Sequence, residues 1–182
     1  VSPVDQGLID QVMHIGNGSE PQGLDPHIVT GVPEHHLLIT MCEGLTISNP
    51  EGGANLPGMA ESWEISEDGK TYIFNIRKDA KWSNGDDFLA EDMVWSWMRV
   101  LTPSLGSQYP DMLYYVVGAE EFNTGVITDF SKVGVKAIDA KTLEVKLNNP
   151  TPFFLGLLSH YSTWPVHKET VLEFGEIDDR QG

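Results

Sequence analysis

Cysteine is almost absent from the chain. The one thiol among its 182 residues belongs to Cys42, so the sequence can form neither an internal disulfide nor a zinc site built on several thiolates. Cys42 ends the apolar run Leu37–Cys42, and a free cysteine in such a run usually packs as a small hydrophobic residue. The sequence therefore predicts a buried thiol rather than a nucleophile.

Basic residues are scarce as well. The chain has 11 Lys and Arg against 27 Asp and Glu, a formal net charge of −16. Such a surface repels phosphate backbones and anionic lipid headgroups, so neither nucleic acid nor a membrane surface is an expected partner. The excess of acid does not imply a cationic ligand, because acidic surfaces commonly serve solubility.

Long apolar runs are missing. No stretch approaches the ~20 residues that a membrane-spanning helix needs. The start, Val1–Asp5, lacks the basic stretch and apolar core of a signal peptide, and the polar end, Ile177–Gly182, closes no apolar pattern. We therefore expect either a cytosolic protein or a processed or trimmed piece.

Signatures of catalysis and of metal binding are also missing. The sequence contains no Gly-x-Ser-x-Gly, no phosphate loop and no His-Glu-x-x-His. Its carboxylates lie mostly in turns or at a helix start, where turn chemistry and the helix dipole account for them. His35 and His36 form a pair, but neighbours on a helix point about 100° apart, and no further ligand follows at i+4. The prediction is no enzyme, no metal and no cofactor, with convergence of His27 on this pair as the metal alternative.

The first 44 residues predict a strand and a helix. Residues 8–15 have the apolar character of a short strand, and a Gly-rich stretch follows at 16–23. Pro33 begins a helix that runs to about Cys42, since proline at the first helical position loses no hydrogen bond. One strand and one helix cannot bury a core, so this region is expected to join a sheet completed elsewhere.

Residues 45–86 predict antiparallel hairpins. Residues 45–47 and 62–65 are short strands, and the turn 67–70 leads into an alternating strand at 71–77. Tyr72, Phe74 and Ile76 fall on one face of that strand. Trp63 and Trp82 are expected to pack on the core rather than to serve as stacking platforms.

Residues 90–101 predict the clearest helix. Asp86 or Asp87 is expected to cap it, and Val94, Trp97, Met98 and Leu101 to form its buried stripe, with Trp95 nearer the opposite side. A second helix is predicted from Pro110 to Phe122. Further on, the pattern predicts a hairpin of 133–138 and 142–147 with Leu143, Val145 and Leu147 on one face, an apolar helix or loop at 153–158 and a short helix at 168–174. These elements make a mixed α/β fold of α+β character.

An ordered set of short motifs carries a resemblance to a known family. The motifs are Leu24-Asp25-Pro26-His27, Glu43-Gly44-Leu45, Pro57-Gly58-Met59-Ala60-Glu61-Ser62-Trp63-Glu64, Asp68-Gly69-Lys70-Thr71-Tyr72, Trp82-Ser83-Asn84-Gly85-Asp86 and Ala90-Glu91-Asp92. Together they resemble the opening of family 5 solute-binding proteins, and the likeness is strongest to the peptide-binding members. Any one motif is weak, but their order over nearly the whole chain is specific.

The resemblance implies the fold of one lobe of a type II periplasmic-binding protein, with an inserted β-rich domain. On that template residues 1–44 and 165–182 belong to the first lobe, and residues 45–164 form the inserted domain. Family members are considerably longer, so the second lobe is expected to be absent from this chain.

The resemblance also implies the function. Such a protein captures oligopeptides in a cleft between two lobes and delivers them to a membrane ABC permease, in the periplasm or another extracytoplasmic compartment. Peptide-contacting positions of the family match Thr30, Gly31, Val32 and Tyr109; Thr30 departs from the acidic residue expected there, which puts a partner for basic ligand side chains in doubt. The charged anchors for the peptide ends would lie on the missing lobe.

Other functions stay open at this point. The ligand could be a dipeptide, a murein peptide, an oligosaccharide, nickel or haem. A hydrolase domain and a free-standing interaction domain are the alternatives from other classes. Without the resemblance, Gly31 and Val32 would be a loop feeding a helix, and Tyr109 a packed surface residue.

Overall fold

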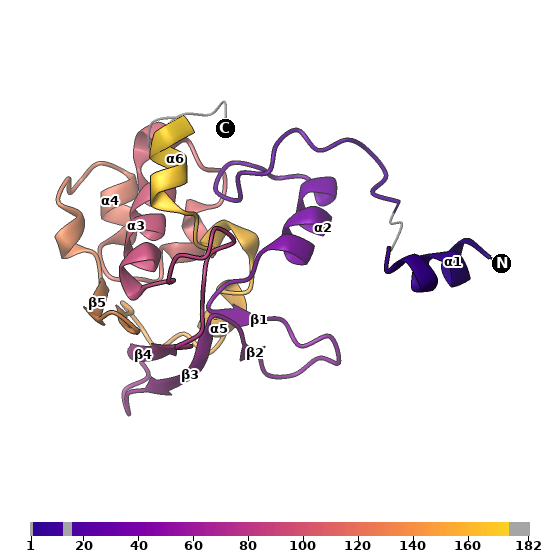
Figure 1. The fold of residues 1–182 in the computed structure, drawn as a ribbon. Coiled ribbons are helices and arrows are strands. Elements are labelled where there is room, and N and C mark those ends of the chain that lie inside the picture. Colours follow the sequence, from indigo (N-terminus) through magenta and orange to yellow (C-terminus); the bar gives the residue numbers. More distant parts are fainter. Residues whose placement is uncertain (1, 13–15, 175–182) are drawn as a thin grey trace.

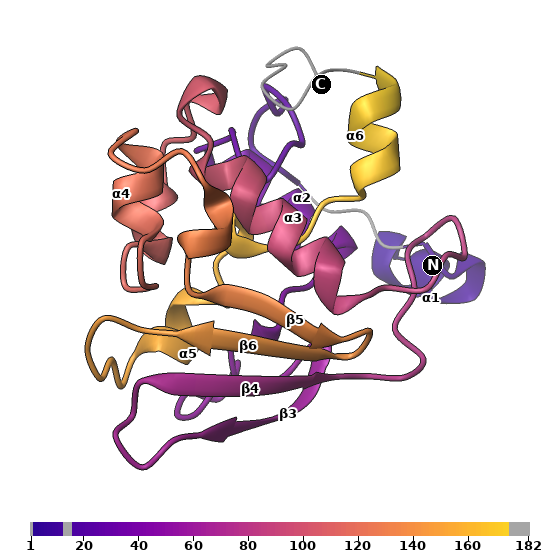
Figure 2. The same ribbon diagram turned by 90° about the vertical axis from the view of Figure 1, so that its left-hand side faces the viewer.

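A four-stranded antiparallel sheet lies at the centre of the fold in the computed structural model, which describes residues 2–12 and 16–174. Its strand order is β3 (Ala60–Ile65), β4 (Thr71–Ile76), β6 (Thr142–Lys146), β5 (Val135–Asp139). Helix α3 (Ala90–Leu101) crosses one face of this sheet, as Figure 2 shows. The mixed α/β class expected from the sequence is confirmed.

The sheet buries the residues that the alternating patterns predict. Tyr72, Phe74 and Ile76 of β4 are each at most 3 % exposed, and Leu143 and Val145 of β6 are fully buried. Tyr72 pairs with Val145 and Phe74 with Leu143, so both apolar faces point to the same side. This side shares one core with α3 and with Phe154 of α5 (Phe154–Leu157).

The other elements lie outside this core, and α1 stands apart from the rest (Figure 1). They are α1 (Pro3–Asp10), α2 (Val32–Met41), the ribbon of β1 (Thr46–Ile47) and β2 (Leu56–Pro57), α4 (Ala119–Asn123), α6 (Lys168–Phe174) and the short 3-10 helices η1 (Pro103–Leu105), η2 (Pro110–Leu113), η3 (Phe130–Lys132) and η4 (Tyr161–Thr163). The predicted helices at 33–42, 90–101 and 168–174 are thereby confirmed. Within the described ranges, no helix has both the length and the apolar character that crossing a membrane requires.

The strand predicted at 8–15 is wrong for its described part. Leu8–Asp10 belong to helix α1, and residues 13–15 lie outside the described residues. The helix starts with a capping box, in which Ser2 Oγ accepts from the Asp5 N–H and Asp5 Oδ2 accepts from the Ser2 N–H. Ser-Pro-Val-Asp is the signature of such a start and was visible in the sequence.

The continuous helix predicted from Pro110 to Phe122 is also wrong. The segment is divided into η2 and α4, and Gly118 between them has a φ of +71°, which ends regular helix. Val116 forms a bridge with Leu147, and the Val117 N–H donates to Lys146 O. Pairing with the sheet therefore overrides the local preference for helix.

Helix α3 differs from its prediction in its cap and its burial. Asp86 and Asp87 do not cap it; the N–H of Leu89, just before the helix, donates to Asp92 Oδ2 at 2.8 Å. Trp97 and Leu101 are buried as predicted, whereas Val94 and Met98 are only half-buried. Trp95 is buried at 8 % exposure, because α6 and the 3-10 helices cover the side of α3 that faces away from the sheet.

The thiol prediction is wrong as well, while the two tryptophans lie as expected. Cys42 is exposed, since α2 is covered only on the side that carries Glu34 and Leu38. Trp63 and Trp82 are half-buried against the central core.

A buried ion pair ties the N-terminal segment to helix α3. The Arg99 guanidinium, 2 % exposed, donates to both carboxylate oxygens of Asp25 at 3.0 and 2.6 Å. Arg99 also donates to His27 Nδ1 at 3.0 Å, and His27 Nε2 lies 2.9 Å from Trp164 O. Asp25 and His27 come from the Leu-Asp-Pro-His motif, so this motif links residues 24–27 to both α3 and residue 164.

This network fixes the protonation state of His27. Arginine can only donate, so Nδ1 accepts and the proton is on Nε2, which donates to the carbonyl of Trp164. Burial, with Arg99 adding to it and Asp25 opposing it, lowers the pKa of His27 to about 4. For Asp25, burial raises the pKa, but the hydrogen bond and charge of Arg99 outweigh it, and its pKa is lowered.

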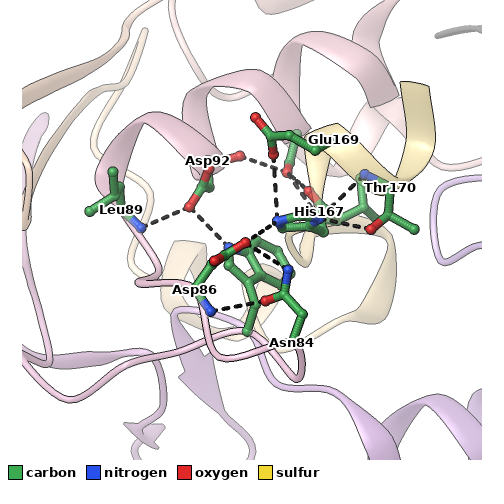
Figure 3. A network of polar contacts seen from close by, with 10 residues as sticks. Asn84, Asp86, Leu89, Asp92, His167, Glu169 and Thr170 are labelled. Carbon is green, nitrogen blue, oxygen red and sulfur yellow. Dashed lines mark hydrogen bonds and ion pairs between the residues drawn. The ribbon is translucent and has the colours of Figure 1, made fainter. Parts of the chain in front are cut away.

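A second polar network holds α6 against α3 (Figure 3). The Val166 N–H donates to Ser96 Oγ at 3.0 Å, and the Ser96 hydroxyl donates to Asp92 O at 2.7 Å. The His167 ring meets the Trp82 ring edge-on, with centroids 5.1 Å apart, and His167 Nε2 lies 3.5 Å from carboxylate oxygens of Asp86 and Glu169. Residues 166–167, just before α6, are therefore fixed near α3, the helix that also holds residues 24–27.

Replacing Arg99 by Met is expected to lower the free energy of unfolding by about 3 to 5 kcal/mol, because Asp25 and the acceptor nitrogen of His27 would stay buried without a donor. The matched control is Arg77→Met, which breaks the half-exposed pair with Glu43 (2.7 Å). Solvent screens that pair, so about 1 kcal/mol or less is expected. Urea unfolding measures both; equal losses would contradict the assigned weight of the Arg99 network.

The shifted pKa of His27 predicts a loss of stability on acidification. The unfolded chain takes up this proton near pH 6.5 and the folded chain only near pH 4. The stabilisation is therefore complete above pH 6.5 and declines by at most about 3 kcal/mol as the pH falls to 4. His27→Gln has no proton to take up there, so its unfolding free energy, measured in urea from pH 7.5 to 4.5, should fall less steeply; parallel curves would contradict this.

Candidate functional site

The loop before α2 holds three of the four predicted site residues. The Tyr161 hydroxyl donates to Val29 O at 3.2 Å and fixes the chain just before Thr30. Thr30 is exposed, Gly31 is the N-terminal cap residue of α2 in an extended conformation, and the Val32 side chain is 66 % exposed. The three residues therefore lie at the surface on an anchored support.

The start of α2 leaves backbone groups free. The Gly31 carbonyl accepts from the His35 N–H at 3.1 Å and begins the helix, but no side chain caps it. Within the described part of the chain, the N–H groups of Gly31 and Val32 have no hydrogen-bond partner. Exposed, unpaired groups of this kind can pair with an extended backbone, as an added strand does.

The Glu34 side chain packs beneath the loop that precedes α2 and is hydrogen-bonded to it. Its side chain is buried, and Oε1 accepts from the Gln22 N–H at 2.7 Å. A Cβ on Gly31 would overlap the Glu34 carboxylate, so any larger residue there would have to displace that side chain. Thr30, Gly31 and Glu34 line a hollow of about 380 Å³, which neither Val32 nor Tyr109 reaches.

Tyr109 connects to this loop through Tyr161. The Tyr109 ring meets the Tyr161 ring edge-on with centroids 6.3 Å apart, and Tyr161 in turn holds Val29. Burial, with Tyr109 beside it, raises the pKa of Tyr161 to about 12, so its hydroxyl stays a donor. The four predicted residues thus belong to one connected region, although Tyr109 follows Val32 by 77 positions in the chain (109 − 32).

Tyr161, Glu34 and His160 are the supporting residues that the sequence did not single out. Tyr161 packs with Leu38 and Trp164 in a small core of its own. An aromatic residue between His160 and Ser162 carries no local sign of this role, because its partners come from residues 29–38 and 109. The Gly-Val-Pro-Glu start of α2, by contrast, could have signalled a buried Glu34.

The histidines of the predicted metal alternative, His27, His35 and His36, do not converge in the described structure. His27 is buried in the Arg99 network, and the rings of His35 and His36 are tilted with centroids 6.2 Å apart. The search of residues 2–12 and 16–174 gives no group of three or more His, Cys, Asp or Glu side chains that could hold a metal ion.

A larger groove of about 950 Å³ contains none of the four predicted residues. It is mainly apolar, and its lining joins the two ends of the described chain: Leu24, Met41 and Cys42 from one side, Val166, Val171 and Phe174 from the other.

Gly31→Ala should displace the Glu34 carboxylate and free the Gln22 N–H, because the new methyl group occupies the space of that carboxylate. Amide exchange at Gln22 is expected to accelerate about tenfold or more, the loss of one hydrogen bond of about 1.5 kcal/mol. Gly23→Ala is the control, since its Cβ would make only an ordinary contact with Val29 at 3.5 Å. Similar acceleration in both variants would contradict the role of Gly31.

Several known proteins are similar to this chain in sequence and in fold. Residues 56–181 match the profile of bacterial extracellular solute-binding proteins, family 5, middle region. The periplasmic oligopeptide-binding protein OppA of Escherichia coli K12 is 46 % identical over 91 % of this chain and 30 % of its own length, and OppA of Bacillus subtilis 168 is 41 % identical over 86 % and 28 %. The crystal structure of Haemophilus influenzae OppA in complex with RPPGFSPFR is 40 % identical and superposes with a TM-score of 0.82 over 88 % of this chain and 31 % of that one. The chain therefore spans about a third of the length of these relatives. It belongs to family 5 of the bacterial extracellular solute-binding proteins.

Proposed function

We propose that the chain is the N-terminal part of an ABC-importer substrate-binding protein that captures oligopeptides in a cleft between two lobes. The observation that carries this proposal is the close likeness to the Haemophilus influenzae protein solved with a bound peptide, 40 % identical with a TM-score of 0.82. The chain spans 31 % of that relative, so it is expected to supply only part of a two-lobe clamp.

The proposed domain division separates the two terminal segments of the chain from its middle part. Residues 1–44 and 165–182 belong to lobe I, and residues 45–164 form the inserted β-rich domain; of the return segment, residues 175–182 lie outside the described residues. Two observations support it. The sheet and α3 share one core within 45–164, and segments from both flanks line the 950 Å³ groove together.

The proposed ligand wall consists of Thr30, Gly31, Val32 and Tyr109. An extended peptide would pair its backbone with the free N–H groups of Gly31 and Val32, and the Tyr109 ring would contact a side chain. Backbone pairing reads no side chain, so binding of many sequences is expected. Threonine at position 30 offers a hydroxyl where an acidic residue would attract basic ligand side chains.

The remaining parts of the proposal follow from the family. The protein binds and releases its ligand without chemistry, works in the periplasm or another extracytoplasmic compartment, and hands the peptide to a membrane ABC permease. The relatives named above are called oligopeptide-binding proteins, and the Escherichia coli protein is called periplasmic.

Calorimetric titration tests this function. The sample is the longer protein of which this chain would be the N-terminal part, and the titrants are mixed short peptides. A tight, reversible one-to-one complex is expected, and mass spectrometry should recover the peptides intact. Cleaved peptides would support the hydrolase alternative, and absence of binding would overturn the proposal.

The 182-residue chain alone should bind the same peptides at least about 100-fold more weakly, a loss of about 2.7 kcal/mol, because one wall lacks the opposing contacts that offset the entropy of association. Comparable affinity for the isolated chain and the longer protein would contradict the two-lobe mechanism.

A further inference from the structure

A cluster of aromatic and imidazole rings continues the proposed ligand wall beyond Tyr109. The His160 ring lies edge-on to Tyr109 at 5.2 Å between centroids and 4.3 Å from Tyr161. Tyr161 also contacts the ring of His35, with the two ring centroids 5.6 Å apart. His160 therefore lies beside Tyr109, the residue that we assign to a ligand side chain, and His35 of α2 joins the same cluster through Tyr161.

The hydrogen bonds of His160 fix where its proton lies. The Ser162 backbone N–H, which can only donate, points to His160 Nδ1 at 3.3 Å, and the Ser162 hydroxyl lies 2.8 Å from the same nitrogen. Nδ1 is therefore the acceptor, and the proton of the neutral ring is on Nε2. Across the described residues, Nε2–H has no hydrogen-bond partner, and the ring is half-buried.

Two titratable side chains act on His160, namely His35 on α2 and Asp111 on η2. His36 is next to His35 along the helix. The Glu34 carboxylate accepts a hydrogen bond from the Gln22 N–H. Burial and the charge of His35 lower the pKa of His160, against Asp111, so the ring is a neutral donor at pH 7 and a cation in more acidic solution.

We propose that His160 is a further specificity-determining residue of this wall, whose Nε2–H binds the side-chain carboxylate of an acidic residue in the peptide. The proposal rests on the proposed peptide-binding function. A carboxylate is preferred to an amide because a charged acceptor strengthens the hydrogen bond.

Isosteric peptide pairs test this subsite in the longer protein. Tripeptides with Glu or Gln at each position in turn are titrated calorimetrically at pH 7.5. At one position the Glu peptide should bind about five- to tenfold more tightly than its Gln counterpart, because a charged acceptor strengthens the hydrogen bond.

His160→Phe keeps a ring against Tyr109 and Tyr161 but removes Nε2–H. It should abolish the preference for Glu, so that the Glu and Gln peptides bind this variant equally. His36→Phe, at an exposed neighbouring position, is the matched control and should keep the preference.

The outcomes separate the two proposals. Binding without a preference for Glu at any position, or a preference that persists in His160→Phe, overturns the subsite alone. Failure of every peptide to bind overturns the proposed function and the subsite with it.

Discussion

The buried guanidinium of Arg99 is the constraint on which the rest of the arrangement depends. A guanidinium that is 2 % exposed requires buried partners, and Asp25 and His27 supply them for its two terminal nitrogens from a segment 70 or more positions away. Because His27 must accept from Arg99, its other nitrogen must donate, and it does so to Trp164. One charge on α3 thereby connects residues 24–27, which precede the sheet in the chain, with residue 164, which follows it.

The candidate site follows from this anchoring. Residues 24–27 are held on α3, so the chain that follows passes Val29, whose carbonyl meets Tyr161, and then enters α2 at Gly31. Tyr161 stands three residues before Trp164 and is carried by the same fixed segment. Thr30–Val32 and Tyr109 belong to one wall because both contact elements that the Arg99 network positions.

The sequence predicted those parts of the fold that repeat locally. The alternation in β4 and β6 requires only neighbouring residues, and it was correct down to the buried face. The helix expected over 110–122 failed because Val116 and Val117 pair with a strand 30 positions later, a competing interaction that no local pattern contains. Helix α1 was missed although its capping box was visible, because an apolar stretch was given more weight than Ser2 and Asp5. For the site, the resemblance supplied Thr30, Gly31, Val32 and Tyr109, but the residues that join them, Tyr161 and Glu34, act across long separations and could only be found in the structure.

The chemistry of the wall is divided between support and surface. The supporting groups, Glu34 and Tyr161, are buried and hydrogen-bonded, so folding has already fixed them. The groups that face outward, the N–H groups of Gly31 and Val32 and the Nε2–H of His160, have no partner in the described chain. A ligand can therefore pair with them without reordering the wall, which keeps the entropic cost of binding low. Under the proposed function, donors held in this way would meet the carbonyl and carboxylate oxygens of a peptide, although the chain has a net charge of −16; local geometry rather than net charge would then select the acceptors.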